Sequence, residues 1–168
     1  ARYEKIKEER EKRKNAKPKK ADFSKKKQTK KNITAKEITI VNLNKADTLG
    51  LAELPEIGPF FARNIIDYRE KLGGYIEKEQ LLEVYGFDSA RLKVISPYID
   101  ISDSVIRKIN VNNNDFKTIL RHPYIEYEDV KKIVNYRESK GFIKDWGTYL
   151  KVVDRENIDE RLKNYIEY

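Results

Sequence analysis

A proline–glycine corner in the middle of the chain combines residue types that could hold an anion. The segment "LPEIGPFFARNIIDYR", residues 54–69, places Gly58 and Pro59 between a short apolar stretch and a longer one with helical spacing. Proline suits the first turn of a helix, where its missing N–H costs no hydrogen bond. Backbone N–H groups at a helix N-terminus bind oxyanions when no side chain stands in the way. The corner therefore predicts a phosphate site formed by the amides around Ile57, Gly58 and Phe60.

Charged side chains stand on both sides of this corner. Arg63 follows four residues after Pro59, so we expect it to face solvent beside the site. Glu56 places a carboxylate next to the expected phosphate, and two like charges about 4 Å apart repel by roughly 1 kcal/mol in water. One helix N-terminus contributes only about 0.3–1 kcal/mol per charge, so a stable grip on an anionic polymer needs several such contacts.

A second turn of the same kind occurs at Tyr85 and Gly86. Asp88 or Ser89 is the expected N-cap of the helix that follows this turn. The turn predicts a second, weaker phosphate contact.

These corners belong to a repeat of about sixty-eight residues. "VNLNKAD" at 41–47 recurs as "INVNNND" at 109–115, and "NIIDYREKLGGYI" at 64–76 recurs as "KIVNYRESKGFI" at 132–143. The spacing is 68 residues, and 67 after a predicted one-residue deletion. Self-similarity of this kind indicates two copies of one structural unit.

Each unit is expected to contain four short helices. In the first unit, Asp47 caps a helix that ends before Pro55, and Pro59 begins a second helix that Gly73 closes. The apolar residues of the second helix follow i, i+3, i+4 spacing. A third helix around 81–84 and a fourth around 92–95 complete the unit, so the fold class is all-α.

The motifs resemble the tandem helix-hairpin-helix domain of the competence protein ComEA and its relatives. The resemblance rests on Val41-Asn-Leu-Asn, on Leu54-Pro-Glu-Ile-Gly-Pro, on Tyr68-Arg, on Gly74-Tyr and on Leu82-x-Val-x-Gly. It covers almost all of 41–99, and 109–166 is similar as a degenerate copy. The resemblance implies two tandem (helix-hairpin-helix)2 units that bind DNA without sequence preference and without catalysis, often tethered at the outer face of a bacterial membrane.

The second unit departs from the pattern. The positions that match Gly58 and Gly86 are Glu126 and Asp154. The first unit departs from the pattern at Asp88, where the resemblance implies another glycine. The hairpins of the second unit are therefore expected to be structural, and those at Gly58 and Gly86 remain open to either role.

The first thirty-six residues carry most of the positive charge. They hold sixteen Lys and Arg against five Asp and Glu, a net of +11, so the remainder of a chain of net +8 has a net of −3. The densest cluster is Lys25, Lys26, Lys27, Lys30 and Lys31. Such a segment is expected to be a disordered or partly helical arm. It is a solvated linker, a membrane-proximal spacer attracted to anionic lipid, an arm that binds nucleic acid, or a segment with another role.

The sequence offers little for catalysis or cofactor binding. Cysteine is absent, so no disulfide or thiolate metal site is expected, and no nucleophile–histidine arrangement or phosphate-binding glycine loop occurs. His122, at the position of Leu54, is expected to be structural. No apolar run is long enough to span a membrane. We expect no enzyme activity, no cofactor, no metal and no small-molecule substrate.

The predicted domains are a basic arm at 1–36, a first helix-hairpin-helix unit at 37–101 and a degenerate second unit at 102–168. The first hypothesis is sequence-independent binding of double-stranded DNA through the hairpins, in DNA uptake or handling. The alternative is an envelope-associated scaffold that keeps the fold, contacts a protein partner and has lost DNA binding. The resemblance favours the bacterial envelope, with a membrane tether possible upstream of Ala1; a cytoplasmic location stays open.

Overall fold

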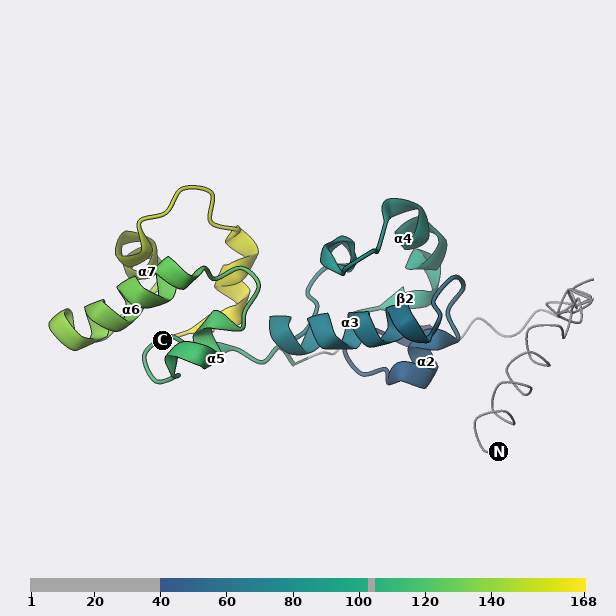
Figure 1. Ribbon diagram of the computed structural model, residues 1–168, viewed down its shortest axis with the longest axis horizontal. Coiled ribbons are helices and arrows are strands. Elements are labelled where there is room, and N and C mark those ends of the chain that lie inside the picture. Colours follow the sequence, from purple (N-terminus) through teal and green to yellow (C-terminus); the bar gives the residue numbers. More distant parts are fainter. Residues whose placement is uncertain (1–39, 103–104) are drawn as a thin grey trace, which may run out of the picture. The chain divides into compact units, whose positions relative to one another are not determined.

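The computed structural model describes residues 40–102 and 105–168, which are mostly helical with four two-residue strands (Figure 1). The prediction of a helical fold is confirmed, because most of the described residues are helical. The four short strands were not predicted. A strand of two residues is too short to give the alternating pattern by which strands are recognised. The predicted arm and its lysines lie outside the described residues.

The elements repeat in order along the chain, with 3-10 helices labelled η. The first repeat contains β1 (Val41–Asn42), α2 (Thr48–Ala52), α3 (Pro59–Leu72), η1 (Lys78–Glu83), α4 (Ser89–Ile95), η2 (Ser96–Tyr98) and β2 (Ile99–Asp100). The second contains β3 (Ile109–Asn110), α5 (Phe116–Leu120), α6 (Tyr127–Lys140), α7 (Trp146–Val153), η3 (Glu160–Tyr165) and β4 (Ile166–Glu167). The third helix of the first repeat and the fourth of the second are 3-10 helices.

The strands join the first and last residues of each repeat. β1 pairs in parallel with β2, in the register Val41 with Ile99, and β3 pairs in parallel with β4, in the register Ile109 with Ile166. Each repeat is therefore closed on itself by backbone hydrogen bonds.

The helix boundaries follow from the residues at their ends. The Asp47 carboxylate accepts from the Gly50 N–H at 2.8 Å, and Asp88 likewise caps α4, as predicted. Pro59 is the first residue of α3, and Gly73, with φ 90°, ends it in the left-handed conformation that glycine favours.

The recurring motif residues have structural roles. In the first repeat, the Asn44 side chain donates to the Tyr75 carbonyl at 2.8 Å and accepts from the Tyr75 N–H at 2.7 Å. Asn112 forms the same pair with Ile143, at 2.8 and 2.9 Å. Asn44 and Asn112, like Tyr75 and Ile143, are 68 residues apart, so the predicted one-residue deletion near Gly74 is wrong. The hydrogen bonds fix the alignment of the two repeats there, whereas the similarity of the sequence at Gly74 and Tyr75 is misleading.

Arg69 and its counterpart Arg137 also recur because their side chains form structural hydrogen bonds. The Arg69 guanidinium donates to the carbonyls of Leu43 and Ala46 at 2.9 and 2.7 Å. Arg137 repeats these bonds in the second unit at 3.0 and 2.9 Å. The long helix of each repeat is thereby tied to the loop that follows the first strand.

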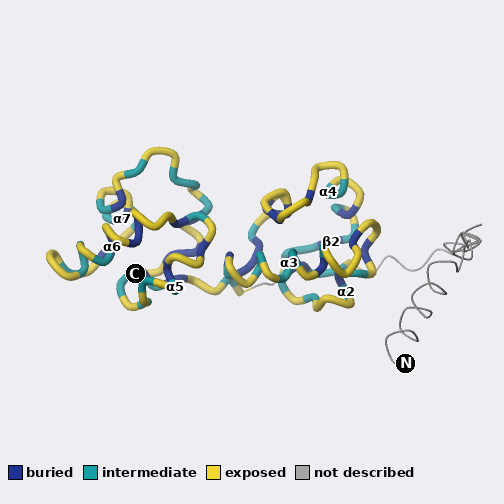
Figure 2. Tube along the Cα trace, in the orientation of Figure 1, coloured by how far each residue is buried: buried dark blue, intermediate teal, exposed yellow. Residues whose placement is uncertain are grey.

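Buried residues occur in both repeats (Figure 2). A buried polar network also joins the repeats to one another. The amide of Gln80 donates to the hydroxyls of Tyr124 and Tyr165 at 2.8 and 2.9 Å. The Tyr165 hydroxyl in turn donates to the Gly74 carbonyl at 2.8 Å. Because Gln80 and Tyr165 are fully buried, these bonds hold the repeats together in a medium where leaving them unmade is costly.

Within the described residues, none of the helices combines the length and the apolar character needed to cross a lipid bilayer.

Candidate nucleic-acid interface

The N-terminus of α3 is open. Gly58 is its N-cap, with φ −89° and ψ 178°, and it supplies no side-chain hydrogen bond to the helix. Pro59 is the first helical residue, and the first turn carries no acidic side chain. Such an end presents the positive pole of a fourteen-residue helix to solvent.

The glycine at position 58 is required neither by the backbone nor by packing. Its φ of −89° is one that any residue adopts, and a Cβ placed on it would have no atom within 4 Å. Gly86 differs, since its φ of +75° lies in the left-handed region. The lack of a side chain at position 58 therefore leaves the helix end accessible to a ligand.

The amides of this corner do not all match the prediction. Ile57 is buried, and its N–H donates to the Leu54 carbonyl at 3.1 Å, so the prediction of a free amide at Ile57 is wrong. The cause is the hairpin turn, which uses this donor to close itself. In the part of the chain that the structure describes, the N–H groups of Gly58, Phe60 and Phe61 have no acceptor. The available donors are thus shifted into the first turn of α3.

Glu56 lies beside these amides in an unfavourable conformation. It is exposed and has φ 60°, a left-handed value that costs a residue with a Cβ about 1–2 kcal/mol. A glycine would adopt this conformation without that cost. Glu56 adds a negative charge to the edge of the site.

The two hairpins of the first repeat meet at Phe61. Its ring lies 3.7 Å from where a Cβ of Gly86 would be, and it packs edge-on against Phe87 with ring centroids 6.0 Å apart. The structure therefore brings the corner at Gly58 and the turn at Gly86 onto neighbouring parts of one surface. Tyr85 is 83% exposed and Phe60 is 59% exposed, although the Phe60 ring also packs edge-on against Phe61 with centroids 5.3 Å apart.

Arg91 is a residue of this site that the sequence reasoning missed. Its guanidinium lies 4.1 Å from the centre of the Phe61 ring and donates to the Asp88 carboxylate at 3.2 Å. It thereby links the first turn of α3 to the N-terminus of α4. The signal was available in the Arg-Leu-Lys that occurs in α4 and again in η3, and only the fold shows what the arginine contacts.

The remaining predicted residues are placed as follows. Arg63 is exposed on α3, and no ion pair to it is found among the described residues. Asp88 is engaged as the cap of α4 and as the partner of Arg91. The five lysines from Lys25 to Lys31 lie outside the described residues.

The N-terminus of α6, at the same place in the second repeat, is closed. The Glu126 carboxylate accepts from the Asp129 N–H, and the Asp129 carboxylate accepts from the Glu126 N–H at 2.9 Å, which is a capping box. Arg155 forms ion pairs with both acids, at 3.2 Å to Asp129. The site that would receive a phosphate is occupied by the protein's own carboxylates.

His122 lies between the repeats and has a structural environment. It is 1% exposed, and its Nδ1 accepts from the Tyr124 N–H at 3.3 Å. Burial lowers the pKa of His122 to about 4, with a partial offset from the backbone of Leu72. The imidazole is therefore neutral near pH 7, with its proton on Nε2.

Comparison with known proteins identifies the first repeat. Residues 36–100 match the helix-hairpin-helix motif, which confirms the predicted resemblance for this stretch. This motif indicates a capacity to bind DNA, and the open end of α3 lies within it.

One curated relative is the "Endonuclease/exonuclease/phosphatase family domain-containing protein 1" of Xenopus laevis. It is 27% identical over 133 residues, covering 67% of this chain and 24% of the relative. The chain thus spans about a quarter of that protein's length. No solved structure matches the chain.

Proposed function

We propose that this protein binds double-stranded DNA without sequence preference and without catalysis, through the first helix-hairpin-helix repeat. The observation that carries the proposal is the uncapped N-terminus of α3. The free amides of Gly58 and Phe60 bind one phosphate there, and the turn at Gly86 contributes a neighbouring contact. A role in DNA uptake or DNA handling fits this activity.

The chemistry of the site favours the DNA backbone over the bases. Backbone amides and cations recognise phosphate position and charge, which carry no base identity. Arg63 adds a cation beside the open helix end. The cluster at Lys25, Lys26, Lys27, Lys30 and Lys31 adds charge from the arm, and each phosphate it neutralises makes the affinity more salt-dependent, with a slope of about 0.9 per phosphate.

The substitution Gly58→Asp tests the proposal without harming the fold. Position 58 has room for a side chain and an ordinary φ, and aspartate is a favourable N-cap. The variant should be at least as stable as the wild type. It should bind an unrelated-sequence duplex about tenfold more weakly in fluorescence anisotropy at low salt, because a carboxylate takes the amides and repels the phosphate.

Two further variants of the full chain complete this experiment. Asn113→Asp adds the same charge at an exposed position of the second repeat and should leave the affinity within about twofold of the wild type. Deletion of residues 1–36 should weaken binding and reduce its salt dependence while leaving the effect of Gly58→Asp in place. If the deletion abolishes binding and Gly58→Asp changes nothing, the hairpins have no part in DNA binding.

A scaffold role is the second candidate. The capping box at Glu126 and Asp129 favours it, as does the net charge of −3 of residues 37–168. In this case the fold contacts a protein partner, and neither the full chain nor the chain without residues 1–36 binds DNA at low salt. A location in the bacterial envelope, with a tether before Ala1, stays a prediction under either candidate.

The name of the Xenopus relative describes a domain of a much longer protein. We propose no part of that chemistry for this chain, whose candidate site consists of backbone donors and cations that bind phosphate.

A further inference from the structure

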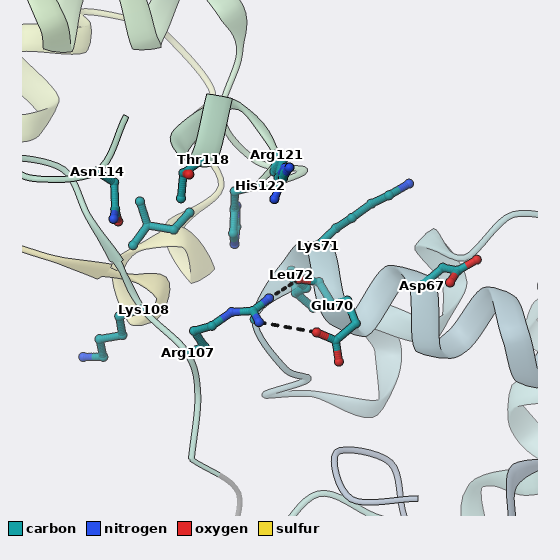
Figure 3. A pocket seen from close by; sticks show the side chains of 12 residues that line it. Asp67, Glu70, Lys71, Leu72, Arg107, Lys108, Asn114, Thr118, Arg121 and His122 are labelled. Carbon is teal, nitrogen blue, oxygen red and sulfur yellow. Dashed lines mark hydrogen bonds and ion pairs between the residues drawn. The ribbon is translucent and has the colours of Figure 1, made fainter. Parts of the chain in front are cut away.

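A pocket of about 710 Å³ lies between the C-terminal end of α3 and the end of α5 (Figure 3). Four of its lining residues are basic and two are acidic. The basic ones are Lys71, Arg107, Lys108 and Arg121, and the acidic ones are Asp67 and Glu70. The lining therefore has a net charge of 4 − 2 = +2, in a part of the chain whose net charge is −3.

Most of this positive charge is available to a ligand. Arg107 is used inside the protein, because its guanidinium contacts the Glu70 carboxylate at 3.4 Å and also the Glu70 carbonyl (Figure 3). Lys71, Lys108 and Arg121 form no ion pair with any described residue. Three exposed cations thus remain around one concavity after the internal pairing is complete.

The repeat itself does not require these cations. With the spacing of 68 residues, Arg121 occupies the position of Glu53, and Lys71 corresponds to Ser139. The residues that hold the fold, such as Asn44 and Arg69, recur in the second unit, but the pocket cations do not. Their presence in the lining of this pocket is therefore a property of the junction.

The α3 end of the pocket is arranged so that it does not repel an anion strongly. The last carbonyls of a helix carry partial negative charge. At this end the Gly73 carbonyl accepts from the backbone N–H of Arg107 at 2.9 Å. The Gly73 N–H donates to the backbone carbonyl of Arg69. The carbonyl that faces the junction is thus already paired with a donor.

A buried polar group adds to this argument. His122 lines the pocket at the position where the first repeat has Leu54. Its Nδ1 accepts from Tyr124, so its proton is on Nε2, and this buried atom reaches the backbone of Leu72 without completing a hydrogen bond to it. A buried donor that is not fully paired is costly, and an acceptor within the pocket would satisfy it.

We propose that this pocket binds a phosphate group, held by Arg121 and Lys71 from the two repeats, with Lys108 nearby. The phosphate belongs either to a free nucleotide or to DNA. Because α3 has fourteen residues and rises about 1.5 Å per residue, the pocket lies roughly 20 Å along the helix from its open N-terminus. It is therefore a separate site from the one at Gly58.

The test is a titration of the full chain, followed by amide NMR shifts, with inorganic phosphate, with deoxyadenosine monophosphate and with a short duplex. Arg121→Glu and Lys71→Ser copy the residues of the other repeat at the same positions, so both variants should fold. Lys117→Glu is the matched control, because it makes the same charge change on α5 outside the pocket.

We expect saturable shifts at Leu72, Gly73 and Arg121, with affinity lowered about tenfold or more by Arg121→Glu and less by Lys71→Ser. Lys117→Glu should change it less than threefold. If none of the three probes gives saturable shifts at the pocket, or if Lys117→Glu weakens binding as much as Arg121→Glu, the proposal is wrong.

The same experiment separates the two sources of phosphate. If DNA occupies the pocket, Arg121→Glu weakens duplex binding further when it is added to Gly58→Asp. If a free nucleotide occupies it, Arg121→Glu weakens nucleotide binding and leaves duplex binding unchanged. The pocket proposal stands without the DNA site, since nucleotide binding should survive in Gly58→Asp.

Discussion

The N-termini of α3 and α6 have the same length of helix behind them and nearly the same backbone, yet one is open and the other closed. The N-cap angles are φ −89° and ψ 178° at Gly58, and φ −91° and ψ 161° at Glu126. Two carboxylates satisfy the N–H groups of Glu126 and Asp129 in α6, whereas the matching N–H groups of Gly58 and Phe61 have no acceptor among the described residues. A capping box stabilises a helix and removes its anion site at the same time.

An arginine packs over the third helical residue at both ends, with different consequences. In the first repeat this residue is Phe61, and Arg91 stacks on its ring at 4.1 Å. In the second it is Asp129, which pairs with Arg155 at 3.2 Å. The aromatic residue anchors the arginine without engaging the helix amides. The first repeat therefore leaves the N–H groups of Gly58 and Phe61 free, and the second uses those of Glu126 and Asp129 in its capping box.

The largest effect is expected from opening the closed end. Asp129→Ala should lower the free energy of unfolding by about 3 kcal/mol, because it removes one partner of a buried ion pair and leaves the Glu126 N–H unsatisfied. Urea denaturation followed by circular dichroism measures this change. A loss under about 1 kcal/mol would mean that the capping box contributes little and that the contrast between the two ends is only geometric.

The second effect is a pH dependence of stability that arises at His122 and has no counterpart at Leu54, the matching residue of the first repeat. The folded state holds the pKa of His122 at about 4, below its ordinary value of 6.5, so unfolded chains bind more protons as the pH falls between these values. Stability from the neutral imidazole is therefore complete above pH 6.5 and is lost on acidification, by roughly 2 kcal/mol at pH 5.

His122→Leu, which copies the residue of the first repeat, removes this dependence. The measurement is the difference between the urea stabilities of the variant and the wild type at pH 7 and at pH 5. We expect the variant to gain relative to the wild type on acidification. A difference that does not change with pH would show that His122 titrates normally in the folded protein.

The smallest effect is expected from a substitution at Glu56, beside the open N-terminus of α3. Glu56→Gly relieves a left-handed residue and should stabilise the protein by about 1 kcal/mol. Because it also removes a carboxylate beside the free amides, it should strengthen duplex binding a few-fold in anisotropy at low salt. Glu53→Gln, which removes a nearby exposed charge without changing the backbone, is the control for charge alone. Weaker duplex binding by Glu56→Gly would contradict the placement of the phosphate.

The parts of this fold that depend on local chemistry could be predicted from the sequence. Asp47, Asp88 and Pro59 set helix ends by contacts within a few residues, and the repeat itself predicts two similar units. The parts that depend on contacts across the fold could not. The parallel strand pairs join residues almost sixty positions apart, and the register of the second repeat is fixed by the hydrogen bonds of Asn112.

The candidate site shows the same division. The open corner at Gly58 follows from a glycine before a proline, which is visible in the sequence. The loss of the Ile57 amide to the hairpin turn and the stacking of Arg91 on Phe61 both depend on how the chain folds back. The closed end of α6 was predicted from Glu126 only as the loss of a glycine; the part played by Asp129 and Arg155 required the structure.

The most direct test of the contrast between the two ends is amide NMR of the full chain titrated with an unrelated-sequence duplex at low salt. The account predicts saturable shifts of the Gly58, Phe60 and Phe61 amides, with much smaller shifts at Glu126 and Asp129. Equal shifts at both ends, or shifts confined to residues 1–36, would contradict the claim that the uncapped end of α3 binds the DNA backbone.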